Sequence, residues 1–517
     1  RLAGVLVEAN PAISRVFESW KQSGKDQETL MSNLEKNSDL KDLLLAETPW
    51  VAEAADEAEQ KRRIALLFDL NGMSSRLQQA ADKLRTLQLT DGSWSWYKGM
   101  KGSRYITTQT VELMARLKAM NISLTDGMEA QYGRALGYLR KEVKKVYEQM
   151  RIQERENNIQ VRPDEQIVKY LYICALDETA RKQADKEINT YFLARLTNRS
   201  AECSIYEKSL LAVIMHAYGQ KRQAELLLQS VKEYMLATPE MGRYFDTSKA
   251  GYSWNSYKIP TQVAAMEAIW RIAPDQHLLG DMKQWLLKQK QVQVWDTPLA
   301  TADAVYAFLG MGGNRLQISG SLKARIGSKT LVTPDDALGY VRQTYTGADT
   351  EVSRIAVVKS GEGLSWGAVY AQYLEDMIRV RPFRTNGLGI VREYWLGDEQ
   401  VSASTRLKPG DKLIVRLTVK ADRDMDFVQI KDERASCMEP AVQLSGYHWN
   451  GGIGYYQVNK DASTEFFIDQ MRKGTYVLEY TVYLDRPGTY QAGIATIQSA
   501  YAPEFNGHTD GVELTIE

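Results

Sequence analysis

One short pattern in the chain matches a catalytic motif. Gly363-Leu-Ser365-Trp-Gly367 fits G-x-S-x-G, in which two glycines permit a strained strand-to-helix turn that exposes a nucleophilic serine hydroxyl. The preceding Ile355-Ala-Val-Val would supply the strand. The motif requires a parallel sheet of alternating strands and helices, whereas a long helical region precedes it here and plain strands follow it. We therefore do not expect Ser365 to act as a nucleophile.

Aromatic residues gathered in turns indicate a second chemistry, the binding of sugars. The six rings are Trp94, Trp96, Tyr105, Tyr252, Trp254 and Tyr257. Such rings offer flat apolar faces with a polar edge, against which a sugar ring can stack. Hydrolysis at this place would also need a pair of carboxylates, for which Asp91 and Asp246 are candidates by position only. The simpler alternative is that the rings pack the turns and bind nothing.

Thiol and metal chemistry have little support in the sequence. The four histidines are His216, His277, His448 and His508, and the three cysteines are Cys174, Cys203 and Cys437. No histidine pair stands four residues apart and no cysteine pair has metal-binding spacing. Three cysteines are also too few for a disulfide scaffold, so we predict reduced, buried thiols. We expect neither a cofactor nor a metal.

The elements that must position these residues are helical over roughly the first 310 positions. One apolar stripe at helical spacing consists of Tyr132, Leu136, Leu139, Val143, Val146, Tyr147 and Met150. Three helices begin with related strings, Ile106-Thr-Thr-Gln-Thr-Val, Ile259-Pro-Thr-Gln-Val-Ala and Leu299-Ala-Thr-Ala-Asp-Ala, each after a turn that contains tryptophan. Repeated helix pairs must stack to bury their apolar faces. About a dozen helices would close a ring of about six hairpins, so we predict an α/α toroid with the aromatic turns at one end.

After Gly310-Met-Gly-Gly-Asn314 the apolar period changes from that of a helix to that of a strand. Leu413, Val415, Leu417 and Val419 alternate with polar residues, as in a half-buried strand. A strand ending at Leu484 would turn at Asp485-Arg-Pro-Gly488 and form a hairpin with 490–498. We therefore predict three domains: the toroid over 1–311, a smaller β segment over 312–380 and an antiparallel β-sandwich over 381–517.

The overall composition excludes several classes of protein. The 517 residues include 65 Lys and Arg and 65 Asp and Glu, so the net charge is zero. This balance argues against a nucleic-acid-binding protein and against a polybasic membrane-surface protein. No apolar stretch is long enough to span a bilayer. The chain begins at Arg1 without a basic-then-apolar leader, so we expect any export signal or membrane anchor before that residue.

Several local strings resemble the C-terminal portion of bacterial alpha-2-macroglobulin-like proteins. In the helical part they are Glu47-Thr-Pro-Trp-Val51, Glu59-Gln-Lys-Arg-Arg-Ile-Ala-Leu-Leu-Phe-Asp-Leu-Asn71, Asp91-Gly-Ser-Trp-Ser-Trp96 and Arg104-Tyr-Ile-Thr-Thr108. In the β part they are Lys431-Asp-Glu-Arg-Ala435, Met438-Glu-Pro440, Leu444-Ser-Gly-Tyr447, Gly454-Tyr-Tyr-Gln457, Lys473-Gly-Thr-Tyr-Val477 and Gly493-Ile-Ala-Thr-Ile-Gln-Ser-Ala-Tyr-Ala-Pro-Glu-Phe505. The resemblance implies a thioester-type helical domain, a CUB-like segment and a C-terminal macroglobulin domain. It also implies a protease trap in the periplasm or cell envelope, with proteases as partners, rather than an enzyme.

Many members of this family capture proteases through a thioester between the Cys and Gln of a C-x-E-Q motif, whose acyl carbon reacts with lysine amines. The present chain contains no such motif, and Cys437-Met-Glu-Pro440 comes closest but has Pro where the acyl donor should stand. Two explanations stay open: the motif precedes Arg1, or the natural protein lacks it. The alternative function is that of a carbohydrate-active toroid hydrolase or lyase with β accessory domains.

A thioester must be kept from water until it reacts, so a neighbouring domain has to cover it. The last domain carries four large rings in a Gly-rich segment, namely Tyr447, Trp449, Tyr455 and Tyr456. Four rings in so short a segment are not expected all to face inward in a thin sandwich. We predict that they contact the helical domain, the alternative being ordinary packing within the sandwich.

Overall fold

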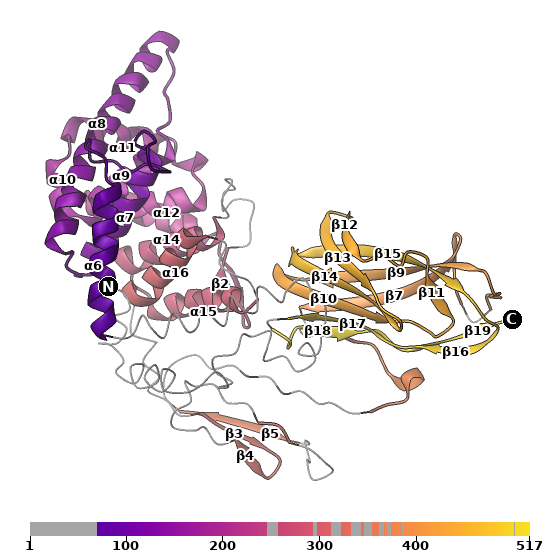
Figure 1. The fold of residues 1–517 in the computed structure, drawn as a ribbon. Helices are drawn as coiled ribbons and strands as arrows, with labels where there is room; N and C mark the ends of the chain where they lie inside the picture. Colours follow the sequence, from indigo (N-terminus) through magenta and orange to yellow (C-terminus); the bar gives the residue numbers. More distant parts are fainter. Residues whose placement is uncertain are drawn as a thin grey trace. The chain divides into compact units, whose positions relative to one another are not determined.

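The computed structural model describes residues 70–245, 257–292, 297–311, 322–331, 343–345, 354–360, 367, 369, 374–384, 387–402, 404–500 and 502–517. The chain divides into two compact units (Figure 1), a mainly helical one within Ile64–Lys288 and Trp295–Leu364 and a β one within Ser365–Glu517. Ser365, Asp246, Tyr252 and Trp254 lie outside the described residues.

Five helices form the inner layer of the first unit. They are α7 (Arg104–Ala119), α9 (Glu165–Leu176), α12 (Ile205–Ala217), α14 (Lys258–Ile272) and α16 (Pro298–Gly310). Consecutive members of this series contact one another, and an ion pair between Arg116 of α7 and Asp303 of α16 joins its two ends. The three related strings seen in the sequence stand at the starts of α7, α14 and α16. These five inner helices therefore form a closed ring.

A second layer of helices packs around the ring. It contains α6 (Leu70–Leu87), α8 (Asp126–Asn157), α10 (Glu178–Gln183), α11 (Lys186–Asn198), α13 (Lys221–Lys232) and α15 (Gln276–Val292). On α8 the predicted stripe faces inward, with Tyr132, Leu139 and Val143 buried. The strands β1 (Leu236–Thr238) and β2 (Gly242–Tyr244) form a hairpin after α13. The described part of the chain thus holds eleven α-helices, and none of them is both long and apolar enough to cross a membrane.

A small antiparallel sheet follows the helices. Its order is β4 (Lys329–Leu331), β3 (Leu322–Ile326) and β5 (Ile355–Lys359). The strand β5 is the one expected before the G-x-S-x-G pattern, but it pairs antiparallel with β3. The nucleophile turn needs a parallel sheet, so this pairing agrees with the expectation that Ser365 is not a nucleophile.

The second unit is a β-sandwich. One sheet has the order β12 (Gly446–Asn450), β13 (Ile453–Asn459), β14 (Ser463–Met471), β10 (Met425–Glu433), β17 (Ala495–Ser499), β18 (Asn506–His508) and β6 (Phe383–Arg384). The other has the order β11 (Met438–Pro440), β15 (Gly474–Leu484), β9 (Lys412–Ala421), β7 (Leu388–Leu396) and β8 (Glu399–Gln400). Residues of both sheets share one apolar core. The predicted order, a helical ring and then an antiparallel sandwich, is confirmed.

Strand alternation follows the sequence closely, but one predicted pairing is wrong. Leu413, Val415, Leu417 and Val419 are all fully buried on β9. The expected hairpin across Asp485-Arg-Pro-Gly488 does not form, because β9 and β11 already occupy both edges of β15. The chain instead leaves the sheet, and β16 (Gly488–Ala492) pairs with β19 (Val512–Ile516).

Candidate functional site

A polar pocket opens at the N-terminal ends of the inner helices. Tyr105, Tyr206 and Leu299 are each the second residue of an inner helix, and all three line the pocket. The other described lining residues are Gln109, Glu112, Leu113, Arg116, Lys169, Tyr257, Pro260, Thr297 and Asp303. The cavity volume is about 30 Å³, and the space not filled by protein atoms reaches about 470 Å³ only when the opening to solvent is included. All five inner helices thus contribute to one pocket.

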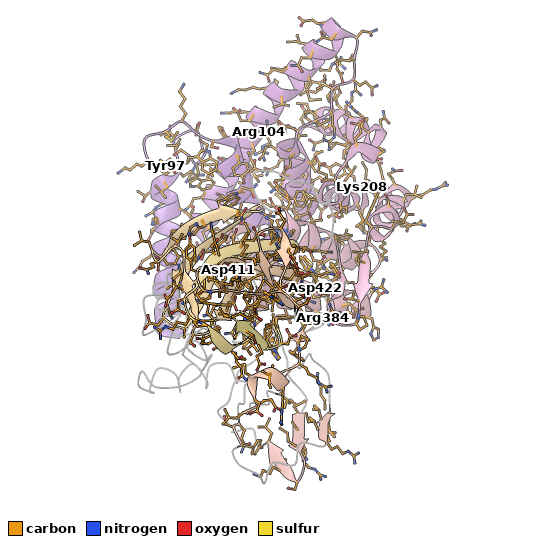
Figure 2. All side chains as sticks on the ribbon, turned by 90° about the vertical axis from the view of Figure 1, so that its right-hand side faces the viewer. Tyr97, Arg104, Lys208, Arg384, Asp411 and Asp422 are labelled. Atoms are coloured by element: carbon orange, nitrogen blue, oxygen red, sulfur yellow. The ribbon has the colours of Figure 1, made fainter. Side chains whose placement is uncertain are left out.

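Helix caps hold this end of the ring in place. The Ser204 hydroxyl accepts a hydrogen bond from the Glu207 amide at 3.2 Å, and the Glu207 carboxylate accepts one from the Ser204 amide at 3.0 Å. This reciprocal capping box fixes where α12 begins. Asp164 caps α9 and also pairs with Arg104 at the start of α7, a residue labelled in Figure 2. The two inner helices α7 and α9 are therefore tied together at their N-terminal ends.

Arg116 is the centre of the charged groups at the buried end of the pocket. One of its terminal nitrogens lies 2.9 Å from Glu112 Oε1, and the other pairs with Asp303 Oδ1. Lys169 Nζ lies 3.2 Å from Glu112 Oε2 and donates a hydrogen bond to Gln109 Oε1 at 3.1 Å. Each of these charged side chains is nearly inaccessible to solvent. Burying so many charges is tolerated only because they are paired.

A second buried carboxylate extends this cluster toward the C-terminal halves of the inner helices. Glu267 of α14 accepts hydrogen bonds from the hydroxyls of Tyr172 and Tyr306 and pairs with Arg271 at 2.7 Å. Tyr172 in turn accepts a hydrogen bond from Arg116 Nε at 3.3 Å. Four of the five inner helices are thereby joined through polar side chains rather than through apolar packing alone.

The two carboxyl groups in the pocket are shifted in opposite directions. Burial by itself raises the pKa of Glu112, but the charges of Lys169 and Arg116 outweigh burial and hold the pKa below its ordinary value. Burial raises the pKa of Asp303 above its ordinary value in spite of Arg116. Burial also raises the pKa of Tyr206 well above that of an exposed tyrosine, so its hydroxyl stays protonated at neutral pH. Glu112 is therefore the more firmly ionised of the two carboxyl groups.

The aromatic residues singled out in the sequence separate into different environments. Trp94 is buried, and its indole N–H donates to the carbonyl of Leu84 at 2.9 Å. Trp96 is half exposed and stacks flat on Tyr105, with ring centroids 5.5 Å apart. Tyr105 and Tyr257 both line the pocket, and the Tyr257 hydroxyl donates to Glu165 Oε1 at 2.7 Å. The structure therefore brings Trp96, Tyr105 and Tyr257 to the pocket end of the ring.

The candidate carboxylate Asp91 serves the turn in which it stands. Its Oδ1 accepts hydrogen bonds from the amide and the hydroxyl of Ser93, at 3.0 and 2.6 Å. Burial opposes ionisation of Asp91, but these bonds hold its pKa below the ordinary value. Asp91 is not among the described residues that line the pocket. No group of three or more described His, Cys, Asp or Glu residues is arranged to hold a metal ion.

In the β unit, the four predicted contact residues lie on the edge hairpin formed by β12 and β13. Tyr455 points into the core and is 5 % exposed, whereas Tyr447 and Trp449 are 71 % and 78 % exposed. Tyr447 and Tyr456 are paired in register, with ring centroids 4.8 Å apart. Tyr447, Trp449 and Tyr456 form what we call the aromatic face. No Lys, Arg, Asp or Glu occurs between Ala441 and Asn459, an absence readable in the sequence that marks this edge as unusual.

The cysteines are placed as predicted, reduced and buried. Cys174 lies on α9, Cys203 just before α12 and Cys437 just before β11. Burial raises the pKa of Cys174 to about 12 and that of Cys437 to about 11. A thiol acts as a nucleophile only as the thiolate, so neither of these two groups is poised to react.

Comparisons with known proteins match both parts of the chain. Residues 387–504 match the family model described as Bacterial Alpha-2-macroglobulin MG10 domain. The alpha-2-macroglobulin homolog of Nostoc sp. is 22% identical over 484 residues, which is 85% of this chain and 23% of the relative. Circularly permutated Ras protein 2 of Dictyostelium discoideum is 25% identical over 172 residues, which is 32% of this chain and 4% of that protein. The chain therefore spans less than a quarter of the length of either relative.

Among solved structures, trypsin-activated alpha-2-macroglobulin from Escherichia coli is 14% identical with a TM-score of 0.39. The similar region covers 94% of this chain and 32% of that protein. The elastase-activated form of the Escherichia coli protein is also 14% identical, with a TM-score of 0.35 and coverage of 89% and 39%.

Proposed function

We propose that this chain, whose residues 387–504 form a bacterial alpha-2-macroglobulin MG10 domain, is the C-terminal part of a protease trap. The resemblance drawn from the sequence is confirmed at the level of the family by that match and by the Nostoc relative. The observation that carries the proposal is the order of parts along the chain, in which a ring of helices is followed by the region that matches the MG10 domain. The partners would be proteases, and the protein would act in the periplasm or cell envelope without being an enzyme.

Covalent capture of a protease would need groups outside this chain. The sequence contains no C-x-E-Q motif, and the three cysteines are buried in their own units. A buried thiol with a raised pKa is a poor partner in thioester chemistry. We therefore propose that this chain covers and supports the reactive group rather than forming it. Either a thioester is formed by residues that precede this chain, or the protein traps proteases without a thioester.

We propose that the aromatic face supplies part of this cover by docking on the helical unit of the same protein. Tyr447 and Trp449 expose large apolar rings that water solvates poorly, and the surrounding segment has no charge that would oppose burial. Edge strands are commonly protected from association by charged residues, and β12 has none. Contact of this face with helices would remove the rings from water and shield whatever group lies beneath.

The trap function is tested on the full-length protein with trypsin. After incubation, trypsin activity is measured on a small chromogenic peptide and on casein, and the products are separated on a denaturing gel. A trap predicts that trypsin keeps its activity on the peptide but loses it on casein, because a caged protease admits only small substrates. A covalent adduct on the gel would indicate an upstream thioester. Equal activity on both substrates, with and without the protein, would refute the trap.

Docking of the aromatic face is tested by the rate of maleimide labelling at an introduced cysteine. The variant Trp449→Cys reports on the face, and Glu513→Cys on exposed strand β19 is the matched control. The native cysteines contribute little background because they are buried. A covered face predicts labelling about tenfold slower at position 449 than at position 513, which corresponds to about 1.4 kcal/mol of docking free energy. Equal rates in the full-length protein would show that the face stays open.

The alternative, a carbohydrate-active enzyme, has one observation in its favour. Glu112 and Asp303 share the pocket and have pKa values shifted in opposite directions, as acid and base pairs do. Both groups, however, are bound to the same arginine, which neutralises the charge that catalysis would use. Release of reducing sugar from polysaccharides by the purified chain would favour the enzyme over the trap.

A further inference from the structure

We propose that the pocket at the N-terminal ends of the inner helices binds a neutral, polyhydroxylated ligand, the terminal unit of a saccharide, without turning it over. The proposal does not depend on the trap function. It is carried by three observations on the described lining residues: their net charge, the hydrogen-bonding groups left open toward the pocket, and the aromatic side walls.

The fixed charges of the pocket favour a neutral ligand. The four charged lining residues are Glu112, Asp303, Arg116 and Lys169, whose charges sum to zero. A cationic ligand would approach the buried arginine and lysine, and an anionic ligand would approach the two carboxylates. Either one would meet a like charge in a region where water screens poorly. A ligand without net charge meets no such opposition and can still use both kinds of group.

The buried groups leave complementary hydrogen-bonding positions open. Asp303 and Lys169 both line the pocket but lie more than 4.0 Å apart, since no ion pair joins them among the described residues. One carboxylate oxygen of Asp303 accepts a hydrogen bond from Arg116, and the second oxygen accepts none from any described residue. Lys169 donates to Gln109 and Glu112, which leaves one N–H of its ammonium. A ligand hydroxyl can accept from Lys169 while donating to Asp303.

Tyr206 offers a third position. It is 3 % exposed and lines the pocket, yet its hydroxyl has no hydrogen-bond partner within the described part of the chain. This hydroxyl is not one of the fully buried unpaired polar atoms, so it is open to the pocket, where water or a ligand can form a hydrogen bond with it. The Tyr206 ring is fixed by an edge-on contact with Tyr257 at 5.1 Å, and Lys169 Nζ lies 5.7 Å from its centre. The hydroxyl is therefore held in one place, ready for a ligand hydroxyl.

The side walls suit the other half of a sugar, its C–H faces. Tyr105, Tyr257, Pro260 and Leu299 present apolar surface between the opening and the charged end. Trp96 stacks on Tyr105 and is half exposed, which extends the aromatic surface toward solvent. Sugars combine weakly apolar C–H faces with ordered hydroxyls, so they fit a pocket with aromatic sides and a polar end.

The same geometry argues for binding rather than hydrolysis. Glycoside hydrolysis uses two carboxyl groups that act on the scissile bond from opposite sides. Here both oxygens of Glu112 are engaged, one by Arg116 and the other by Lys169. Among the described carboxyl groups that line the pocket, only Asp303 retains an open oxygen toward the ligand. One free carboxylate oxygen can orient a hydroxyl but does not supply the acid and base pair that hydrolysis requires.

The test measures binding of glucose, N-acetylglucosamine and cellobiose to the 517-residue chain by saturation-transfer NMR and calorimetry. The variant Tyr206→Phe removes only the open hydroxyl, and Tyr147→Phe on α8, outside the pocket lining, is the matched control. Loss of one hydrogen bond predicts about 5- to 10-fold weaker binding in Tyr206→Phe and no change in Tyr147→Phe. A second variant, Leu299→Trp, narrows the opening without touching the charged end and is expected to abolish binding. Circular dichroism checks that each variant is folded.

Three outcomes would overturn the proposal. The first is that none of the three sugars binds at the highest soluble concentration, which would leave the pocket to water alone. The second is that methylammonium or acetate binds more tightly than every sugar, which would contradict the argument from charge. The third is that a sugar binds with equal affinity to the wild type, Tyr206→Phe and Leu299→Trp, which would place its site elsewhere.

Discussion

The ion pair between Arg392 and Asp432 allows the sharpest prediction about the β unit. Arg392 lies on β7 of the five-stranded sheet and Asp432 on β10 of the seven-stranded sheet, so the pair joins the two layers. The Arg392 nitrogen lies 2.7 Å from Asp432 Oδ1, and each side chain is 1 % exposed. Tyr480 donates to Asp432 Oδ2 at 2.8 Å, and Gly493 O accepts from Arg392 at 2.6 Å. Both charges are thus buried and paired, and within the described part of the chain only Arg392 Nε lacks a hydrogen-bond partner in this group.

The perturbation is Arg392→Met, which keeps the apolar length of the side chain and removes its charge. Asp432 then loses its ion-pair partner and keeps only the charge of Arg434, which forms no ion pair with it. Removing one partner of a buried ion pair costs about 3–5 kcal/mol of folding free energy. At about 2–4 °C per kcal/mol for a domain of this size, Tm of the β unit should fall by about 6–20 °C. Burial already raises the pKa of Asp432, and the variant raises it further. Folding then takes up a proton, so part of the lost stability should return as pH falls.

The assay is differential scanning calorimetry of the whole chain, with Arg416→Met as the matched control. Arg416 pairs with Glu479 at 2.6 Å on the same sheet, but these side chains are 33 % and 38 % exposed. Exposed pairs contribute about 0–1 kcal/mol, so the control should shift the transition little. The double variant Arg392→Met with Asp432→Leu should recover most of the loss, because no unpaired charge remains. If Arg392→Met and Arg416→Met destabilise equally, the argument from burial is refuted.

Three further predictions concern the helical unit and the thiols. Arg195 lowers the pKa of Glu154 to about 2 from an ordinary 4.5, so this pair stabilises the fold above pH 4.5 and the stabilisation is lost as pH falls toward 2. Between pH 4.5 and 2, Tm should therefore decline less steeply for Glu154→Gln than for the wild type. An equal slope for the two proteins would contradict this prediction. Cys174 and Cys437 should not react with a thiol reagent at pH 8 until denaturant is added, and a rapid stoichiometric reaction in the native protein would disprove their burial. Ser204→Ala removes the cap of α12 and should cost about 1 kcal/mol in thermal unfolding, whereas Ser204→Gly should cost only a few tenths.

Much of the architecture could be predicted from local pattern. The stripe on α8 and the alternation on β9 both emerge as buried faces, because spacing along a chain decides which side chains share a face. The related strings at Ile106 and Ile259 lie at the starts of the inner helices α7 and α14, and the described turn with Trp94 and Trp96 precedes α7. The resemblance to bacterial alpha-2-macroglobulins also rests on local strings, which survive where overall identity is low.

Pairing between distant elements could not be read in the same way. The sequence around Asp485-Arg-Pro-Gly488 favours a hairpin, but β15 already has a neighbour on each edge, and these neighbours come from earlier in the chain. A turn signal states only that the chain changes direction. Which strand then lies alongside depends on edges that are still open once the sheet has assembled.

The residues of the pocket were even harder to predict from local sequence than the strand pairing. Asp303 is the single charge of α16, and Lys169 and Glu267 each interrupt an apolar run of their helix, which is a signal that sequence analysis overlooked. Even so, the partner of each charge lies on another helix or at another turn. Arg116 and Asp303 are 187 positions apart in the chain and meet only because the ring closes.

Three properties can be read without a structure: the helical and strand periods, the absence of a C-x-E-Q motif and the local strings that resemble an MG10 domain. Each of them is a property of neighbouring residues. The three-dimensional fold was needed to show that Glu112, Lys169 and Asp303 share one pocket and that Tyr455 turns inward while Trp449 is exposed. The physical reason is that burial and charge pairing depend on contacts between segments far apart in the chain. Such contacts arise when helices close into a ring and sheets stack, and no local pattern encodes them.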